Sequence, residues 1–141
     1  MQKVSQEEII KFCHKNSVID FLKVDVVPTD DGKVRLELFV EEQHTNPYGM
    51  LHGGVMTTML DTAMGAECFA RRKVVVTVSM TIEFMKPVPL HTKIITDAKI
   101  FHDGKQILIC EGKLIDESGE LYAKADATFF AIRTFEGKEE K

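Results

Sequence analysis

The chain has 141 residues, of which 44% are hydrophobic and 28% charged, values typical of a globular domain with one sizeable core. Its net charge of −4 argues against nucleic acid as a partner, because nucleic-acid-binding proteins usually carry a basic patch or stripe. No run approaches the ~20 apolar residues of a membrane span, and the N-terminus lacks the apolar stretch of a signal peptide. We therefore expect a single domain over residues 1–141, with neither membrane nor nucleic acid as a partner.

The three cysteines are odd in number and lie far apart, at Cys13, Cys68 and Cys110. They form neither a CxxC pair nor a zinc-ligand spacing. This pattern is typical of reduced, partly buried thiols, and it predicts a cytoplasmic protein without a bound metal. The sequence has no Walker phosphate-binding loop and no GxGxxG motif, so no cofactor is expected.

The first part of the chain predicts one short helix followed by two strands. Ser5, with acidic residues after it, is typical of a helix start, and apolar residues give the helix expected over 5–16 one apolar face. A short strand over 24–27 is closed by Pro28, and the next four residues predict a turn. Apolar residues then alternate with other residues over 34–40, which is the period of a strand.

The rest of the chain predicts one long helix and then only strands. The helix begins at Gly53 or Gly54, is mostly apolar, and ends near Phe69. Strands are predicted at 74–84, 94–101, 106–115 and 121–132, with turns at 102–105 and 116–120. The charged tail at 136–141 is expected to be frayed.

In the strand over 74–84, alternation divides the side chains between two faces. The apolar face holds Val76, Val78, Met80, Ile82 and Phe84, and the polar face holds Thr77, Ser79, Thr81 and Glu83.

The order of elements predicts the fold class. A helix, two strands, one long apolar helix and four strands in a meander define an α+β protein with segregated elements. A long apolar helix needs covering on nearly all sides, and a curved antiparallel β-sheet wrapped around it provides that cover.

The stretch from Asn46 to Asp61 holds the residues that point to function. Gly53 and Gly54 let the backbone approach a ligand closely, and free N–H groups at a helix start favour negative charge. Asp61 is a lone carboxylate among apolar residues, which is costly to bury unless something uses it or pairs with it. The alternatives are a simple tight turn for the glycines and a capped or salt-bridged structural role for Asp61.

Several short segments in this order resemble the hotdog-fold acyl-CoA thioesterases of the PaaI-like type, and the resemblance covers nearly the whole chain. The matching residues are Asn46, Gly49, His52-Gly53-Gly54, Asp61, Phe84-Met85-Lys86-Pro87-Val88, and Asp116 with Gly119-Glu120-Leu121-Tyr122-Ala123. The resemblance implies the hotdog fold and hydrolysis of acyl-CoA thioesters at sites shared between the subunits of a homodimer or of a homotetramer built from two dimers.

The resemblance also implies roles for individual residues. A carboxylate at the place of Asp61 is the catalytic base or nucleophile, and the N–H of Gly53 helps to bind the thioester oxygen, which becomes negative in the tetrahedral intermediate. Residues such as Asn46 and His52 support the loop or position substrate and water. For His52 we favour loop anchoring over direct base chemistry.

The spacing of Gly53 and Asp61 adds a constraint of its own. Nine residues of helix span roughly 13 Å, so Asp61 cannot touch a carbonyl held on the Gly53 N–H of the same chain. We therefore expect a second subunit to bring its Asp61 to this helix start, which requires an oligomer.

Substrate-binding roles are expected for a further set of residues. Gly54 and Thr62 belong to the predicted helix, Ser79 and Thr81 offer hydroxyls for the attacking water or the acyl group, and Lys86 and Lys105 are candidates for holding the CoA phosphates. The alternative for these cations is simple solvation, which is the more frequent role of a charge cluster. The alternative functions are a non-catalytic acyl-CoA sensor and an acyl-thioester dehydratase or hydratase on the same fold.

Overall fold

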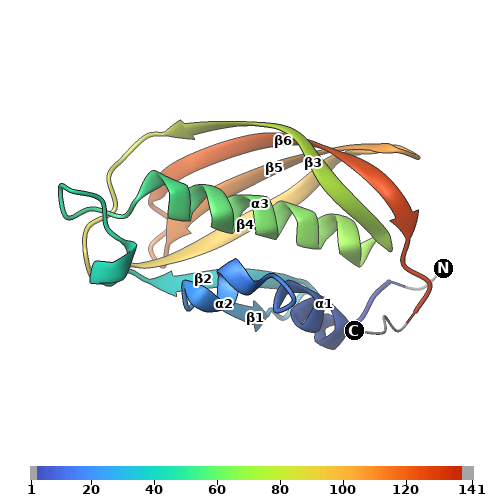
Figure 1. Ribbon diagram of the computed structural model, residues 1–141, viewed down its shortest axis with the longest axis horizontal. Coiled ribbons are helices and arrows are strands. Elements are labelled where there is room, and N and C mark those ends of the chain that lie inside the picture. Colours follow the sequence, from blue (N-terminus) through green and yellow to red (C-terminus); the bar gives the residue numbers. More distant parts are fainter. Residues whose placement is uncertain (1–2, 138–141) are drawn as a thin grey trace.

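The computed structural model describes residues 3–137 and shows one antiparallel sheet curved around a long helix (Figure 1). The elements are α1 Gln6–Cys13, α2 Ser17–Phe21, β1 Asp25–Pro28, β2 Val34–Phe39, the 3-10 helix η1 Glu42–His44, α3 Gly53–Ala70, β3 Lys73–Phe84, β4 Lys93–Asp103, β5 Ile107–Asp116 and β6 Leu121–Thr134. The six strands follow the order β1-β2-β4-β5-β6-β3. The sheet wraps α3, and α1 and α2 lie beside β1 and β2. This is the α+β architecture expected from the sequence.

The predicted meander of four strands is wrong at its first strand. β4, β5 and β6 do form a meander, but β3 pairs with β6 at the edge of the sheet and not with β4. Both edges of β4 are already taken, by β2 on one side and β5 on the other. The connection from β3 therefore crosses the end of α3, where the Leu51 N–H donates to the Val88 carbonyl over 2.9 Å.

The N-terminal helix is also shorter than predicted. α1 ends at Cys13, and a second helix, α2, begins after Asn16, whose side chain accepts a hydrogen bond from the Val18 N–H. Asn16 is thus the N-cap of a new helix and not the end of the first one. Of the tail expected to be frayed, only residues 136 and 137 lie within the described residues.

A β-bulge at Val78 overturns the predicted division of β3 into two faces. The register with β6 shifts between Thr77 and Ser79, so Val78 is an extra residue. Before the bulge, the Thr77 hydroxyl points toward α3 and bonds to Asp61. Val76, and Val78 in the bulge itself, are 49% and 59% exposed instead of forming a buried apolar face. After the bulge, the inward side chains are again those that were predicted to share a face, such as Met80 and Ile82. The bulge therefore turns a polar hydroxyl toward the central helix.

The central helix packs closely on a row of small residues in the sheet. Ala98, Gly112 and Ala125 are direct neighbours across β4, β5 and β6. A Cβ atom at Gly112 would lie only 3.2 Å from the Cδ2 of Leu60 and 3.3 Å from the Cγ of Met64, both fully buried on α3. The absence of side-chain bulk in this row allows the helix to sink into the sheet.

A second cluster of buried residues covers the C-terminal end of α3. The rings of Phe12 on α1 and Phe69 on α3 are stacked with centroids 3.9 Å apart, and Phe135 contacts Phe69 from the other side at 4.7 Å. Ile9 and Cys13 complete the apolar face of α1. The predicted apolar face of the N-terminal helix is thus confirmed.

All three cysteines are free and buried. The sulfur atoms of Cys68 and Cys110 lie 3.6 Å apart in the core, and burial raises the pKa of the Cys13 thiol to about 12. Over residues 3–137, no group of three or more His, Cys, Asp or Glu side chains is placed to hold a metal ion. In the same range, no helix has both the length and the apolar character needed to cross a membrane.

We predict that Gly112→Val lowers the free energy of unfolding by about 1–3 kcal/mol, because the new side chain must displace Leu60 or Met64. Urea unfolding measures the loss. Lys113→Val, on the exposed face of the same strand, is the matched control and should change the free energy by less than about 0.5 kcal/mol. Equal losses in the two variants would contradict a close approach of α3 at Gly112.

Candidate active site

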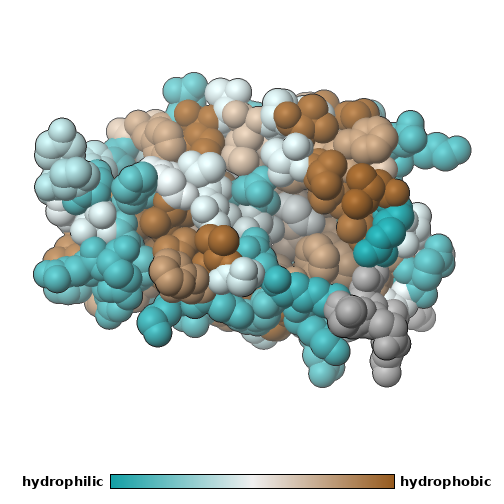
Figure 2. Space-filling model, viewed as in Figure 1, coloured by the Kyte–Doolittle hydropathy of each residue, from teal (hydrophilic) through white to brown (hydrophobic). Residues whose placement is uncertain are grey.

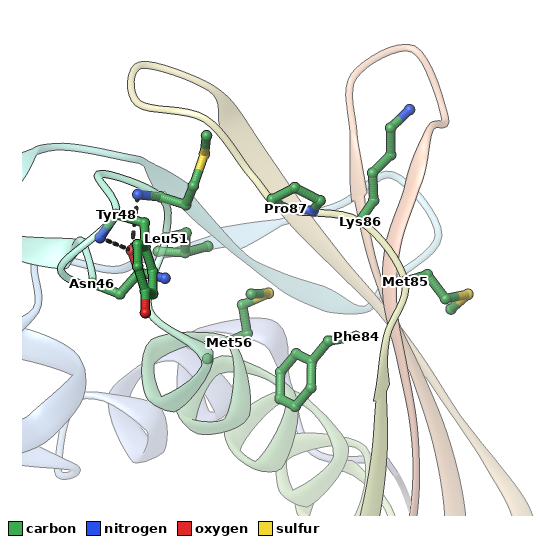
Figure 3. A pocket seen from close by; sticks show the side chains of 10 residues that line it. Asn46, Tyr48, Leu51, Met56, Phe84, Met85, Lys86 and Pro87 are labelled. Atoms are coloured by element: carbon green, nitrogen blue, oxygen red, sulfur yellow. Dashed lines mark hydrogen bonds between the residues drawn. The ribbon is translucent and has the colours of Figure 1, made fainter.

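The loop before α3 is held by the Asn46 side chain. Its Oδ1 accepts hydrogen bonds from the N–H groups of Tyr48 at 2.9 Å and Met50 at 3.1 Å (Figure 3). The backbone N–H of Asn46 donates to the Met50 carbonyl, and Gly49 takes a positive φ of 79° that suits glycine. These bonds close residues 46–50 into a tight turn, so the Asn46 side chain supports the loop.

A buried histidine ties this loop to the N-terminal part of the chain. His44 is 1% exposed; its Nδ1 accepts from the Glu41 N–H, and its Nε2 donates to the Leu22 carbonyl at 2.7 Å. Its own carbonyl accepts from the His52 N–H at 2.8 Å. Sequence reasoning gave His44 no role, and its contacts show that it positions the backbone.

His52 caps α3 and leaves one N–H group without an acceptor. The His52 Nδ1 accepts from the Gly54 N–H at 2.8 Å, so its Nε2 carries the proton in the neutral ring. This contact favours the anchoring role over base chemistry and occupies the N–H of Gly54. The N–H of Gly53 has no hydrogen-bond acceptor among residues 3–137. The helix start thus presents one free donor at the positive end of the helix dipole.

The free N–H lies at a recess of about 450 Å³, here called the Gly53 recess. The lining residues are Asn46, Tyr48, Met50, Leu51, Gly53, Met56, Phe84, Met85, Lys86 and Pro87. The Phe84 ring extends toward α3 near Met56, whereas Lys86 points away at the rim (Figure 3). The Glu120 carboxylate accepts a hydrogen bond from Lys86 and raises the pKa of its ammonium group, so Lys86 stays protonated and its charge is paired with that of Glu120.

Asp61 lies in a second recess of about 320 Å³, here called the Asp61 recess. The hydroxyl of Thr77 donates to the Asp61 Oδ1 at 2.7 Å, which fixes one oxygen and leaves Oδ2 for other partners. Sequence analysis missed Thr77. Its place on the polar face of β3 was the only signal, and the bulge that brings it to α3 cannot be seen in the pattern of residues.

The remaining predicted site residues lie in different places. Thr62 lines the Asp61 recess, where its hydroxyl accepts from the Asn16 amide at 3.4 Å. Ser79 and Thr81 are exposed on β3, which is an edge strand. Lys105 lies in the turn after β4; the neighbouring Asp103 binds Arg71 just beyond the C-terminal end of α3. Within one protomer, Lys105 is therefore at the opposite end of the helix from the Gly53 recess.

The two recesses share no lining residue. Gly53 and Asp61 are held more than two turns apart on one rigid helix, as the spacing predicted. A single protomer thus carries a free donor and an oriented carboxylate that cannot act on the same atom.

The β3 edge borders the exposed stripe of α3. Thr57, Thr58, Asp61 and Gly65 are only partly buried along that stripe, and apolar side chains gather over the first half of β3 in the same view (Figure 2). Val76 and Val78 are the exposed apolar residues of this half. A long edge strand with exposed apolar side chains, and with charged residues only near its two ends, is the type of edge that pairs with another strand.

Comparison with known proteins adds the family. The model of the thioesterase superfamily matches residues 48–123, more than half of the chain. Human acyl-coenzyme A thioesterase 13 is 35% identical over 109 residues, which cover 75% of this chain and 78% of that protein.

Solved structures agree with this result. The PaaI protein of the Escherichia coli phenylacetic acid degradation operon superposes with a TM-score of 0.83 at 21% identity, covering 92% of this chain and 95% of that one. A Bacillus halodurans protein solved with CoA gives a TM-score of 0.75 at 26% identity, covering 91% and 93%. The expected hotdog fold is confirmed, and the chain belongs to the thioesterase superfamily.

Proposed function

We propose that this protein hydrolyses acyl-CoA thioesters to the free acid and CoA, in the cytoplasm and without a metal or cofactor. The observation that carries the proposal is that the free Gly53 N–H and the Asp61 carboxylate held by Thr77 lie on one helix. The name of the human relative and the CoA in the Bacillus halodurans structure support the same substrate. The three free cysteines suit a reducing compartment.

The site is shared between two protomers that pair along β3. A twofold pairing of this edge strand extends the sheet across both protomers and brings the exposed stripes of the two helices together. Such a dimer buries Val76 and Val78 and closes the open side of α3. Two dimers then pair through the convex face of the sheet, where the exposed Ile107 and Phe130 are cross-strand neighbours.

The contacts of α3 with β3 set the register of this pairing. Asp61 lies beside Thr77, and a Cβ on Gly53 would lie 3.4 Å from the Phe84 ring. Asp61 reaches the partner's Gly53 when Thr77 pairs opposite the partner's Phe84. Because Val78 is the extra residue of the bulge, this register sets Thr81 opposite the partner's Thr81 and keeps inward side chains on one face. Thr81 then belongs to the dimer axis and not to the substrate.

The chemistry follows from this arrangement. The thioester oxygen accepts a hydrogen bond from the partner's Gly53 N–H, which stabilises the negative charge of the tetrahedral intermediate. Asp61 Oδ2 either removes a proton from the attacking water or attacks the acyl carbon itself to form an anhydride. In both routes the C–S bond breaks, CoA leaves as a thiol after taking a proton, and water supplies the second carboxylate oxygen. Thr77 positions the Asp61 carboxylate throughout.

The CoA arm lies in the partner's Gly53 recess. This recess is apolar near Met56 and Phe84, which suits the pantetheine chain, and the Lys86 ammonium at its rim can meet a phosphate by turning from Glu120. The acyl group points the other way, into the Asp61 recess.

Asp61→Asn should lower kcat by at least about 100-fold, because the amide can neither take a proton nor attack. Release of the CoA thiol, read with a thiol reagent, measures turnover, and the buried cysteines of the chain add little background. The fold should survive, since the amide oxygen still accepts from Thr77. Asp97→Asn, on the exposed face of β4, is the matched control. Full activity of Asp61→Asn would rule out the proposed role.

Gly53→Pro tests the N–H donor and the shared site together. Proline suits a first helical position, and His52 with ψ near 135° tolerates a following proline, so the change removes the N–H with little strain. We expect a loss of about 100- to 1000-fold in kcat.

A 1:1 mixture of the Gly53→Pro and Asp61→Asn proteins, unfolded and refolded together, should recover about a quarter of wild-type activity. Half of the dimers are then mixed, and each mixed dimer has one intact site made from the two unchanged halves. Sites contained within single chains would recover no activity.

Thr81→Cys tests the register. The two cysteines would face each other at a strand-pair distance of about 4.5–5.5 Å between Cα atoms, which permits a disulfide. Mild oxidation should give a covalent dimer on a non-reducing gel. Glu83→Cys, which faces the partner's Ser79 in this register, should stay monomeric on the gel. The reverse pattern would require a different pairing of β3.

A further inference from the structure

We propose that the corner between α1 and α2 is the end wall of the acyl pocket and that Gly65 sets the space available there. The pocket then selects apolar acyl groups of medium length or with one aromatic ring. This inference rests on the proposed function, because it names the substrate class of the same site.

The walls of the Asp61 recess come from three parts of the chain. They are Phe12, Cys13, Lys15 and Asn16 at the α1–α2 corner, Asp61, Thr62 and Gly65 on α3, and Val75, Thr77 and Phe129 on the sheet. The corner lies outside residues 48–123, the part of the chain matched by the family model. This wall therefore comes from outside the segment that the family model matches.

Gly65 leaves open space one helical turn beyond the catalytic carboxylate. It follows Asp61 by four residues, so the two lie on the same face of α3. A Cβ atom at Gly65 would have no neighbour within 4 Å, in contrast to the tight contacts at Gly112. Glycine inside a helix is unfavourable relative to alanine, and here no close packing explains it. The acyl chain of the substrate would lie in this space beside Gly65.

The corner is rigid enough to act as a wall. The Phe12 ring is stacked on Phe69, and Cys13 is 2% exposed. Asn16 caps α2 with its side-chain oxygen and donates its amide to Thr62 on α3 at 3.4 Å. The segment thus holds both ends of the corner against the central helix.

The lining specifies the chemistry of the occupant. Phe12, Val75 and Phe129 are apolar, whereas the charged Lys15 is exposed at the rim. Among residues 3–137, those that line the recess include no buried cation for a second carboxylate on the acyl chain. Its volume of about 320 Å³ lies at the small end of ligand pockets, which run from about 300 to 1000 Å³. Medium-chain and arylacyl groups fit such a space.

The test compares decanoyl-CoA and phenylacetyl-CoA with butanoyl-CoA in two variants of opposite effect. Gly65→Leu fills the space and should lower kcat/KM for the two bulky substrates by about 10- to 100-fold relative to butanoyl-CoA. Gly65→Ala should give a smaller decrease. Phe12→Leu shortens the wall and should raise the ratio of decanoyl-CoA to butanoyl-CoA turnover several-fold.

Phe135→Leu is the matched control for Phe12→Leu. Phe135 contacts the same Phe69 ring but does not line the recess, so its replacement should destabilise the protein similarly and leave the acyl ratio unchanged. Unchanged ratios in Gly65→Leu and Phe12→Leu, or equal shifts in Phe135→Leu, would overturn the proposal. If the wild-type protein hydrolyses none of the three thioesters, the proposed function itself fails, which is a distinct result.

Discussion

The close approach of α3 to the row of small residues in the sheet determines where every functional group lies. Ala98, Gly112 and Ala125 let Leu60 and Met64 sink into the concave face, and this depth fixes the rotation of the helix about its axis. With these two residues inside, Asp61, which follows Leu60 by about 100° of helix rotation, lies on the flank of α3 beside β3, where Thr77 contacts it. The angle of Asp61 is therefore set by the buried side of the helix.

The two ends of the helix are fixed by different kinds of contact. At the start, polar contacts dominate: His52 caps the helix, and His44 and Asn46 hold the loop before it. At the far end, aromatic stacking dominates, with Phe69 between Phe12 and Phe135. The polar end presents a backbone donor, and the apolar end supports the wall of a recess. The division suits a substrate with a charged carrier on one side of its thioester and an apolar group on the other.

Much of this arrangement was predictable from residue patterns, and the failures have physical reasons. The long helix and the strands follow from periodicity, and the special nature of Gly53 and Asp61 from chemistry. The pairing of β3 with β6 was not predictable, because its pattern suits either neighbour equally well. The bulge at Val78 could not be predicted, because a run of β-branched residues is compatible with either face of a strand. The hydrogen bond from Thr77 to Asp61 depends on that bulge and was therefore missed as well. The N–H of Gly53 is free because the His52 side chain accepts from the N–H of Gly54 instead, and the sequence does not indicate which of the two it caps.

The segment of α3 from Gly53 to Asp61 has a consequence for how this protein tolerates insertions and deletions. Each residue of an α-helix adds about 100° of rotation and 1.5 Å of rise. One residue inserted in this segment would rotate Gly53 relative to Asp61 by about 100° and shift it by about 1.5 Å, even if Leu60 and Met64 kept their places in the core. In a symmetric dimer the same change would misplace both sites at once. The number of residues between Gly53 and Asp61 is therefore more tightly constrained than the identity of the side chains between them.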